Sequence, residues 1–268
     1  MTEGRAIVDR DLPLSVVVIV RHPDETPDAV LAALAAEPGI AGVQILLVDG
    51  RTGDGRRNPG PEPDRPGVTT LLRPGLNMPL LKAEGVRAAR GRAIGFLEPK
   101  AVPVRGWIAA ALAATGTRPD AAFSGPVTAA PGGAADRAAY IFEYAAFRRD
   151  AVASGTTRDL AGNNMILPAG AFRQLCGDIL AAEGLNKPFC QKRLQENGIA
   201  LVLLVELEVR MQTRYRLGAL LASRYRYGRC FGGTRAAMAA PADRRRYRLG
   251  APAVPALLIG RHVRSALR

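Results

Sequence analysis

The stretch L-S-V-V-V-I-V, residues 14–20, decides the fold of this chain. Six of its seven residues are apolar and four are valine, so the run lacks the alternation of a strand with one wet face. Such a run is typical of a strand that is buried on both faces of a parallel sheet. At seven residues it is far shorter than the roughly 20 needed to cross a bilayer. We therefore expect a globular α/β protein built around this strand.

Strand and helix patterns alternate after this stretch. They predict further strands at 43–48, 68–72 and 93–97, and helices at 27–37, 76–90 and 107–114. Proline begins the first of these helices and glycine follows the second, as is typical of helix starts and ends. This order indicates a mostly parallel central sheet with helices on its faces. The second half is less regular, and it predicts strands at 121–129 and 199–205 and helical segments at 139–150, 189–198 and around 224–229.

The basic residues gather at the C-terminal end of the chain. Residues 210–268 contain fourteen arginines and one acid, Asp243, which gives +13, whereas residues 1–209 contain 23 basic and 23 acidic residues. The net charge of +13 therefore comes from the last quarter. So basic a segment suits an anionic membrane, a nucleic acid or a polyanionic small substrate, or it is a solvated face without a partner. We rank nucleic acid last, because the arginines match no recognition motif. The tail 251–268 mixes apolar residues with arginines and could lie on a membrane surface.

Histidine and cysteine usage argues against several kinds of site. His22 and His262 are the only histidines and lie near no G-x-S-x-G turn, which disfavours a His-rich metal site and a Ser-His-Asp hydrolase. The three cysteines have no paired spacing, which indicates a reducing compartment. The first ten residues contain no apolar segment, so we expect no signal peptide. These features predict a cytoplasmic protein, located at the inner face of the membrane if the basic segment binds lipid.

Charged residues follow three of the predicted strands. Arg21 follows the first strand, Asp49 the second, and the turn Glu98-Pro99-Lys100 the fourth. In parallel α/β sheets, ligands bind beyond the carboxyl ends of the strands. The topology would bring these residues together, so we predict a ligand site at this edge. For Asp49 alone, a cap of the following turn is the alternative.

The order of the segments resembles that of the family 2 glycosyltransferases, which have the A-type glycosyltransferase fold. The resemblance covers roughly residues 14–235 and rests on seven short segments in the family's order. They are L-S-V-V-V-I-V-R-H (14–22), L-L-V-D-G-R-T-G-D-G (46–55), L-L-K-A-E-G-V-R-A-A-R-G-R-A-I-G-F-L (80–97), V-P-V-R-G-W (102–107), A-G-N-N-M-I-L-P (161–168), F-C-Q-K-R-L-Q-E-N-G-I-A-L (189–201) and R-Y-R-Y-G-R (224–229). The resemblance implies one A-type domain at 14–209, for nucleotide-sugar and acceptor binding, followed by a basic helical extension at 210–268.

The resemblance also implies an activity. Members of the family move a sugar from a nucleoside diphosphate donor to an acceptor, here expected to be a hydroxyl attacked with inversion. The family places an acid that contacts the nucleoside at the position of Asp49, and a D-x-D turn for the ribose and a divalent metal at the position of Glu98. On this basis the expected donor-binding residues are Arg21, Asp49, Lys82, Glu98 and Arg226.

The acceptor side is implied by two further segments. The G-N-N segment contributes Asn163 and Asn164, and Trp107 begins the helix after the D-x-D turn. All three are expected near the acceptor. A packed helix start remains the alternative for Trp107, and plain turn residues the alternative for the two asparagines.

The chain departs from the family at the metal turn. Lys100 stands where the second carboxylate is expected, and a protonated lysine would repel a divalent cation. An ammonium can instead stabilise the charge that grows on a leaving diphosphate, with help from Lys82 and Arg21. We therefore predict no essential metal or cofactor, with Lys100 in a catalytic role. The alternative is that Lys100 is only a solvated turn residue.

A second departure concerns the general base. The family places an acid just before the F-C-Q-K-R-L helix, where this chain has Leu185-Asn186. Glu183 lies closest and is the expected substitute; Asp159 and Asp178 are weaker candidates. Without a base, the rate would fall by about 10² to 10⁴. The sequence thus leaves open a glycosyltransferase acting on a lipid-linked or envelope acceptor, an inactive relative that binds a nucleotide or a partner, and, ranked last, a nucleic-acid-binding protein.

Overall fold

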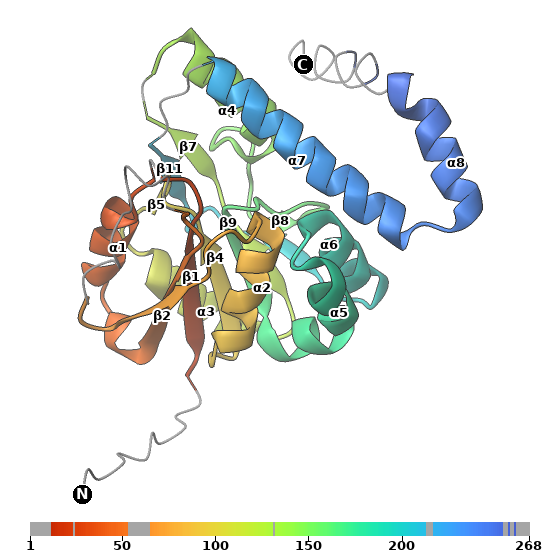
Figure 1. Ribbon diagram of the computed structural model, residues 1–268. Coiled ribbons are helices and arrows are strands. Elements are labelled where there is room, and N and C mark those ends of the chain that lie inside the picture. The colour runs from red at the N-terminus through yellow and green to blue at the C-terminus, as the bar shows by residue number, and fades with distance from the viewer. Residues whose placement is uncertain are drawn as a thin grey trace, which may run out of the picture. The chain divides into compact units, whose positions relative to one another are not determined.

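The computed structural model describes residues 12–23, 25–52, 65–130, 132–212 and 217–253, together with 257 and 260 (Figure 1). The chain divides into two compact units. The first contains residues 1–131 and 146–213, and the second contains residues 132–145 and 214–268. The predicted boundary at 209/210 stays a prediction. The structural division differs from it in assigning 132–145 to the unit that holds the basic extension.

The first unit is built on an eight-stranded sheet in the order β3-β2-β1-β4-β9-β6-β10-β8. The strands are β1 (Leu14–Val20), β2 (Val43–Asp49), β3 (Val68–Leu72), β4 (Ala93–Leu97), β6 (Ala122–Ser124), β8 (Gly155–Thr156), β9 (Asn164–Pro168) and β10 (Leu201–Leu203). The first four strands are parallel to one another, whereas β9 runs antiparallel to both β4 and β6. The predicted mostly parallel sheet is confirmed.

Helices cover the sheet, and β1 is buried along its whole length. The helices of this unit are α1 (Asp28–Ala35), α2 (Met78–Ala88), α3 (Trp107–Thr117), α5 (Ala169–Glu183) and α6 (Lys187–Glu196), with a short 3-10 turn at Ile40–Gly42. A second 3-10 turn, Ala145–Phe147, spans the boundary between the two units. Val17 and Ile19 pack in one core cluster with residues of α2 and α5. Because successive strand residues point to opposite faces, Val16 and Val18 fill the other face. The burial of β1 on both faces, predicted from its sequence, is therefore confirmed.

A second, three-stranded sheet follows the turn after β4. It consists of β5 (Ala101–Pro103), β11 (Val209–Met211) and β7 (Val127–Ala129), in the order β5-β11-β7. The predicted single strand at 121–129 is wrong, because the chain leaves the large sheet after β6 and enters the small one at β7. Gly125 makes this crossing possible, since a Cβ atom there would lie 2.1 Å from the Leu207 carbonyl oxygen.

The second unit consists of helices. They are α4 (Ala134–Tyr144), α7 (Leu217–Met238), α8 (Pro241–Gly250) and the 3-10 turn Ala251–Ala253. From residue 217 onward the described part of the basic segment is helical, whereas Arg210 and Met211 at its start belong to β11. Among the described residues, no helix combines the length and the apolar character that a membrane span requires. Most of the tail 251–268, for which a membrane-surface position was predicted, lies outside the described residues.

Candidate functional site

Three parallel strands end together at one edge of the large sheet. Val20 of β1 pairs with Asp49 of β2, and Val18 pairs with Leu97 of β4. The segments that follow these strands therefore begin side by side. The predicted convergence of Arg21, Asp49 and Glu98 at the carboxyl edge is a consequence of this register.

Asp49 holds the turn that follows its own strand. Its carboxylate accepts hydrogen bonds from Arg51 at Nε and at Nη2, with 2.7 Å to Nη2, and a further bond from the Arg51 backbone N–H. The side chains of Arg51 and Asp49 are only 4% and 7% exposed. The nucleoside contact expected of Asp49 stays a prediction, and a nucleoside would have to share this carboxylate with Arg51.

Glu98 meets a buried lysine from α2. The Lys82 ammonium lies 3.3 Å from Glu98 Oε1 and donates to the Gly162 carbonyl oxygen at 2.8 Å. Lys82 is only 6% exposed as a residue, whereas the Glu98 side chain is 31% exposed. A buried ammonium requires such partners, because leaving a charge unpaired in the interior is costly. Lys82 is therefore a fixed positive charge beneath the turn where the family's first metal-binding carboxylate is expected.

Lys100 has a different partner. Its ammonium lies 3.4 Å from Oε1 of Glu25, in the loop after β1, and its side chain is 37% exposed. The other oxygen of Glu25 accepts hydrogen bonds from the backbone N–H groups of Arg21 and His22. Glu25 was not predicted from the sequence. Glu25 follows Arg21 by four residues and His22 by three, in a short turn that contains a proline. This spacing is the only feature of the sequence that could have indicated its role.

Among the described residues, four carboxylates at or beside the carboxyl edge of the sheet each form an ion pair with a basic side chain. The pairs are Asp49–Arg51, Glu98–Lys82, Glu25–Lys100 and, on the neighbouring loop, Asp159–Lys187. Nor do the described residues contain any group of three or more His, Cys, Asp or Glu side chains with metal-binding geometry. A site with ammonium and guanidinium groups in these positions does not suit a divalent cation. These groups repel the ion, and they occupy the carboxylates that would otherwise be its ligands.

The G-N-N segment is joined to Trp107 inside the core. Trp107 Nε1 donates to Asn164 Oδ1 at 3.0 Å, and Asn164 Nδ2 donates to the Leu207 carbonyl oxygen at 2.6 Å. Both side chains are completely buried. The structure therefore gives Trp107 the packing role that the sequence left as its alternative, and acceptor contacts by Trp107 and Asn164 stay predictions.

Asn163 is also buried, at 2% exposure, but its amide is incompletely bonded. Its Nδ2 lies 3.0 Å from the sulfur of Met211, a weak acceptor. Its Oδ1 has no hydrogen-bond partner among the described residues. Asn163 directly follows Gly162, whose carbonyl oxygen accepts a hydrogen bond from Lys82.

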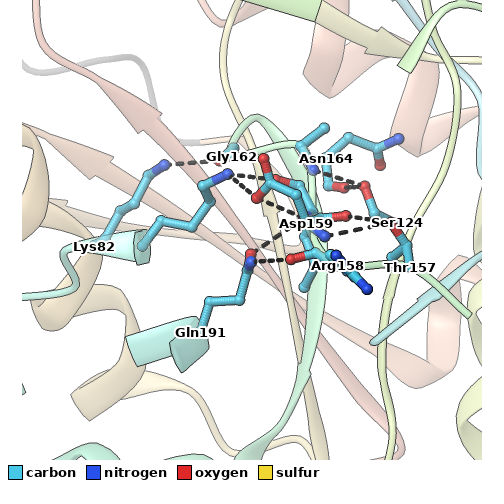
Figure 2. A network of polar contacts seen from close by, with 11 residues as sticks. Lys82, Ser124, Thr157, Arg158, Asp159, Gly162, Asn164 and Gln191 are labelled. Carbon is cyan, nitrogen blue, oxygen red and sulfur yellow. Dashed lines mark hydrogen bonds and ion pairs between the residues drawn. The ribbon is translucent and has the colours of Figure 1, made fainter. Parts of the chain in front are cut away.

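The loop 157–162 is held by side chains from three elements, as Figure 2 shows. Lys187, at the start of α6, donates to Asp159 and to the Leu160 carbonyl oxygen, at 2.5 and 2.7 Å. Gln191 accepts from the Leu160 N–H and donates to the Arg158 carbonyl oxygen, while Ser124 accepts from the Ala161 N–H. Lys187 and Gln191 were not predicted from the sequence. They are spaced four residues apart on one helix face, but nothing local indicates what that face meets.

Glu183 is the last residue of α5, and the segment after it lies against α2. The Leu185 N–H donates to the Pro79 carbonyl oxygen at 2.8 Å, and Gly184 adopts a positive φ of 73°. A Cβ atom on Gly184 would lie 2.4 Å from the Pro79 carbonyl carbon. Glu183 thus adjoins the first turn of the helix that carries Lys82, and its role as base stays a prediction. Asn186, in the position of the family's base, is the N-cap residue of α6.

Two predicted cations remain. Arg21 follows β1 and is partly exposed, and its guanidinium has no hydrogen bond or ion pair with the described residues. Arg226 is exposed on α7, in the second unit. The structure does not place the two units relative to one another, so the donor contact of Arg226 stays a prediction.

Comparison with solved structures identifies the fold. GalNAc-T7 with UDP, GalNAc and Mn2+ matches 77% of this chain and 45% of its own length, with a TM-score of 0.56 and 13% identity. The mannosyltransferase PcManGT from Pyrobaculum calidifontis, in complex with GDP-Man and Mn2+, matches 84% of this chain and 63% of its own, with a TM-score of 0.55 and 16% identity. TarS of S. aureus in complex with UDP-GlcNAc matches 76% and 60%, with a TM-score of 0.55 and 10% identity.

These similarities confirm the A-type glycosyltransferase fold that the sequence predicted. At such low identity they show the fold alone, and the chain spans between 45% and 63% of the length of these three proteins. No protein-family model matches the chain, and no curated protein matches it by sequence.

Proposed function

We propose that this protein transfers a sugar from a nucleoside diphosphate donor to a hydroxyl acceptor, with inversion at the anomeric carbon. One observation carries the proposal: the buried Lys82 ammonium lies between Glu98 and the Gly162 carbonyl oxygen at the carboxyl edge of an A-type sheet. Proteins of this fold have been solved with UDP, GDP-Man or UDP-GlcNAc. In sheets of this topology the carboxyl edge is where ligands bind.

The proposed reaction needs no divalent metal. Negative charge grows on the diphosphate as its bond to the anomeric carbon breaks, and a preorganised ammonium stabilises that charge. Lys82 suits this role better than Lys100, because its partners among the described residues are one carboxylate and one carbonyl oxygen, and an ammonium has three donor positions. Arg21 would add positive charge near the diphosphate. Lys100 would do so once the diphosphate replaces Glu25 as its partner. Glu98 and Asp49 would contact the ribose and the nucleoside.

The acceptor hydroxyl would lose its proton to Glu183. Its oxygen would form a bond to the anomeric carbon on the face opposite the departing diphosphate, which inverts the configuration. The short connection between α5 and α6 would present Glu183 beside α2. On the acceptor side, Asn163 offers an amide oxygen that has no partner among the described residues. A lipid-linked or envelope acceptor would fit the basic second unit.

Replacing the proposed base tests the chemistry directly. The Glu183→Gln variant should lower the rate of sugar transfer by about 10²- to 10⁴-fold, because a glutamine cannot take the proton. Glu196→Gln is the matched control, since Glu196 is an exposed residue at the end of α6. Product would be followed by NMR, which also reports the anomeric configuration. Retained configuration, or equal rates in the two variants, would contradict the proposal.

A second candidate function is a protein that binds a nucleotide or a partner without catalysis. Two observations favour it: an asparagine occupies the position of the family's base, and the Asp49 carboxylate is already bound by Arg51. This candidate predicts binding without product for every donor and acceptor. Product formation that is lost in Glu183→Gln would exclude it.

A further inference from the structure

The second unit exposes large apolar side chains beside its arginines. On α7, Leu221 and Tyr225 are 61% and 69% exposed. Arg229 follows Tyr225 by the same spacing of four residues, and its guanidinium carbon lies 6.0 Å from the Tyr225 ring centroid. Residues four apart share one face of a helix. These three residues therefore form an outward stripe in which an apolar residue, an aromatic residue and a cation succeed one another.

Part of α7 contacts α4 within the unit. Arg224 forms an ion pair with Glu143 of α4 at 3.0 Å, and the Glu143 side chain is only 9% exposed. Thr234 is buried at 3% exposure. Leu221, Tyr225 and Arg229 are thus exposed while another part of α7 contacts α4 in the same unit.

Helix α8 has the same two-sided character. Arg244 donates to the carbonyl oxygens of Ala237 and Ala239 at the end of α7. The guanidinium carbon of Arg235, on α7, lies 3.8 Å from the centroid of the Tyr247 ring. Arg245, Arg246 and Leu249 lie on the opposite face of the helix, by their spacing. All three are exposed, and Leu249 is 84% exposed. The outward face of α8 is therefore a leucine flanked by two arginines.

We propose that these two faces bind an anionic phospholipid membrane. They are called the lipid faces and consist of Leu221, Tyr225 and Arg229 on α7 and Arg245, Arg246 and Leu249 on α8. Arginine heads bind lipid phosphates, while leucine and tyrosine side chains enter the boundary between head groups and acyl chains. Residues 217–253 hold eight arginines against a single acid, Asp243, so the charge is complementary to such a surface.

A nucleic acid would satisfy the arginines but not the leucines, so the lipid surface accounts for more of the observations. The proposal would explain how the chain reaches a lipid-linked acceptor. It does not depend on sugar transfer, because vesicle binding can be measured without a nucleotide.

Vesicle co-sedimentation of the full chain tests the proposal. The protein should bind phosphatidylcholine vesicles that contain phosphatidylglycerol, bind pure phosphatidylcholine weakly, and lose binding at high salt. Arg245→Gln/Arg246→Gln should weaken binding about tenfold or more, since each basic residue near an anionic surface contributes to it. Leu249→Ser should weaken binding while its salt dependence remains. Circular dichroism would establish that each variant is folded.

Arg105→Gln/Arg118→Gln is the matched control, because both arginines are exposed on the first unit and the loss of charge is the same. This control should bind as the unaltered protein does. The proposal would be overturned if the control weakens binding as much as the α8 variant, if the two vesicle types bind equally, or if neither binds. It would also be overturned if a DNA duplex at equal phosphate concentration displaces the protein from the vesicles.

Discussion

At the scale of single residues, the Asn164 side chain joins three segments of the first unit. It begins β9, receives the Trp107 indole N–H from α3, and donates to the Leu207 carbonyl oxygen ahead of β11. The Asn164 and Trp107 residues are both completely buried. The amide thereby fixes the loop whose Gly162 carbonyl oxygen binds Lys82.

Removing this amide should destabilise the protein strongly. Asn164→Ala leaves an indole N–H and a carbonyl oxygen buried without partners, at a cost of about 1–3 kcal/mol for each group. Urea denaturation would measure the loss. Asn197→Ala, at the exposed end of α6, is the control and should change the free energy of unfolding by less than about 1 kcal/mol. Similar losses in the two variants would show that the network contributes little.

The residue scale is also where the sequence is least informative. Lys82 and Glu98 were predicted in the site because each has a recognisable place in the family's order of segments. The pairing of Trp107 with Asn164 was not predicted, because the two are 57 positions apart and only packing brings them together. Glu25 and Arg51 were missed for a related reason: their roles come from turns whose geometry leaves no periodic pattern in the sequence.

At the scale of elements, the packing of α2 on β1 positions Lys82. Gly85 lies one turn after Lys82, and a Cβ atom there would lie 2.4 Å from a methyl carbon of Val17. The close approach of helix to strand at this point requires glycine. It places the Lys82 ammonium at the carboxyl edge of the sheet.

A methyl group at this contact should separate helix and strand. Gly85→Ala should destabilise the protein by about 1–3 kcal/mol, as is usual for overpacking a core, and should weaken donor binding as Lys82 shifts. Gly177→Ala, in the middle of α5 with nothing within 4 Å of the added Cβ, should instead stabilise it by about 0.5–1 kcal/mol. Thermal unfolding of both variants is the measurement. A stabilised Gly85→Ala variant would mean that the contact is loose.

Elements with strong patterns were predicted well. The strands of the first half match the observed β1 to β4 almost residue for residue, because buried parallel strands have unbroken apolar runs. The division of 121–129 into two strands was not predicted, because the close approach of Gly125 to the Leu207 carbonyl oxygen joins residues that are distant in sequence. Helix α5 was missed too, since two glycines interrupt its apolar pattern.

At the scale of the whole molecule, two units divide the charge between them. The first unit carries the A-type sheet and paired charges at its carboxyl edge, and the second carries most of the arginines of the C-terminal segment. Composition alone revealed this asymmetry. It could not reveal that α4, far earlier in the chain, belongs with the basic helices, because that depends on the contact between Glu143 and Arg224.

The central claim is that a fixed ammonium takes the place of a metal ion, and calorimetric titration tests it most directly. UDP, GDP, TDP and their sugar nucleotides would be titrated into the protein in EDTA and then in Mn²⁺. At least one should bind in EDTA. Lys82→Met should weaken that binding about tenfold or more, since one charge-assisted contact contributes about 1.5–3 kcal/mol. Lys192→Met, which removes an exposed lysine of α6, should not. Binding that appears only with Mn²⁺, or that survives in Lys82→Met, would contradict the claim.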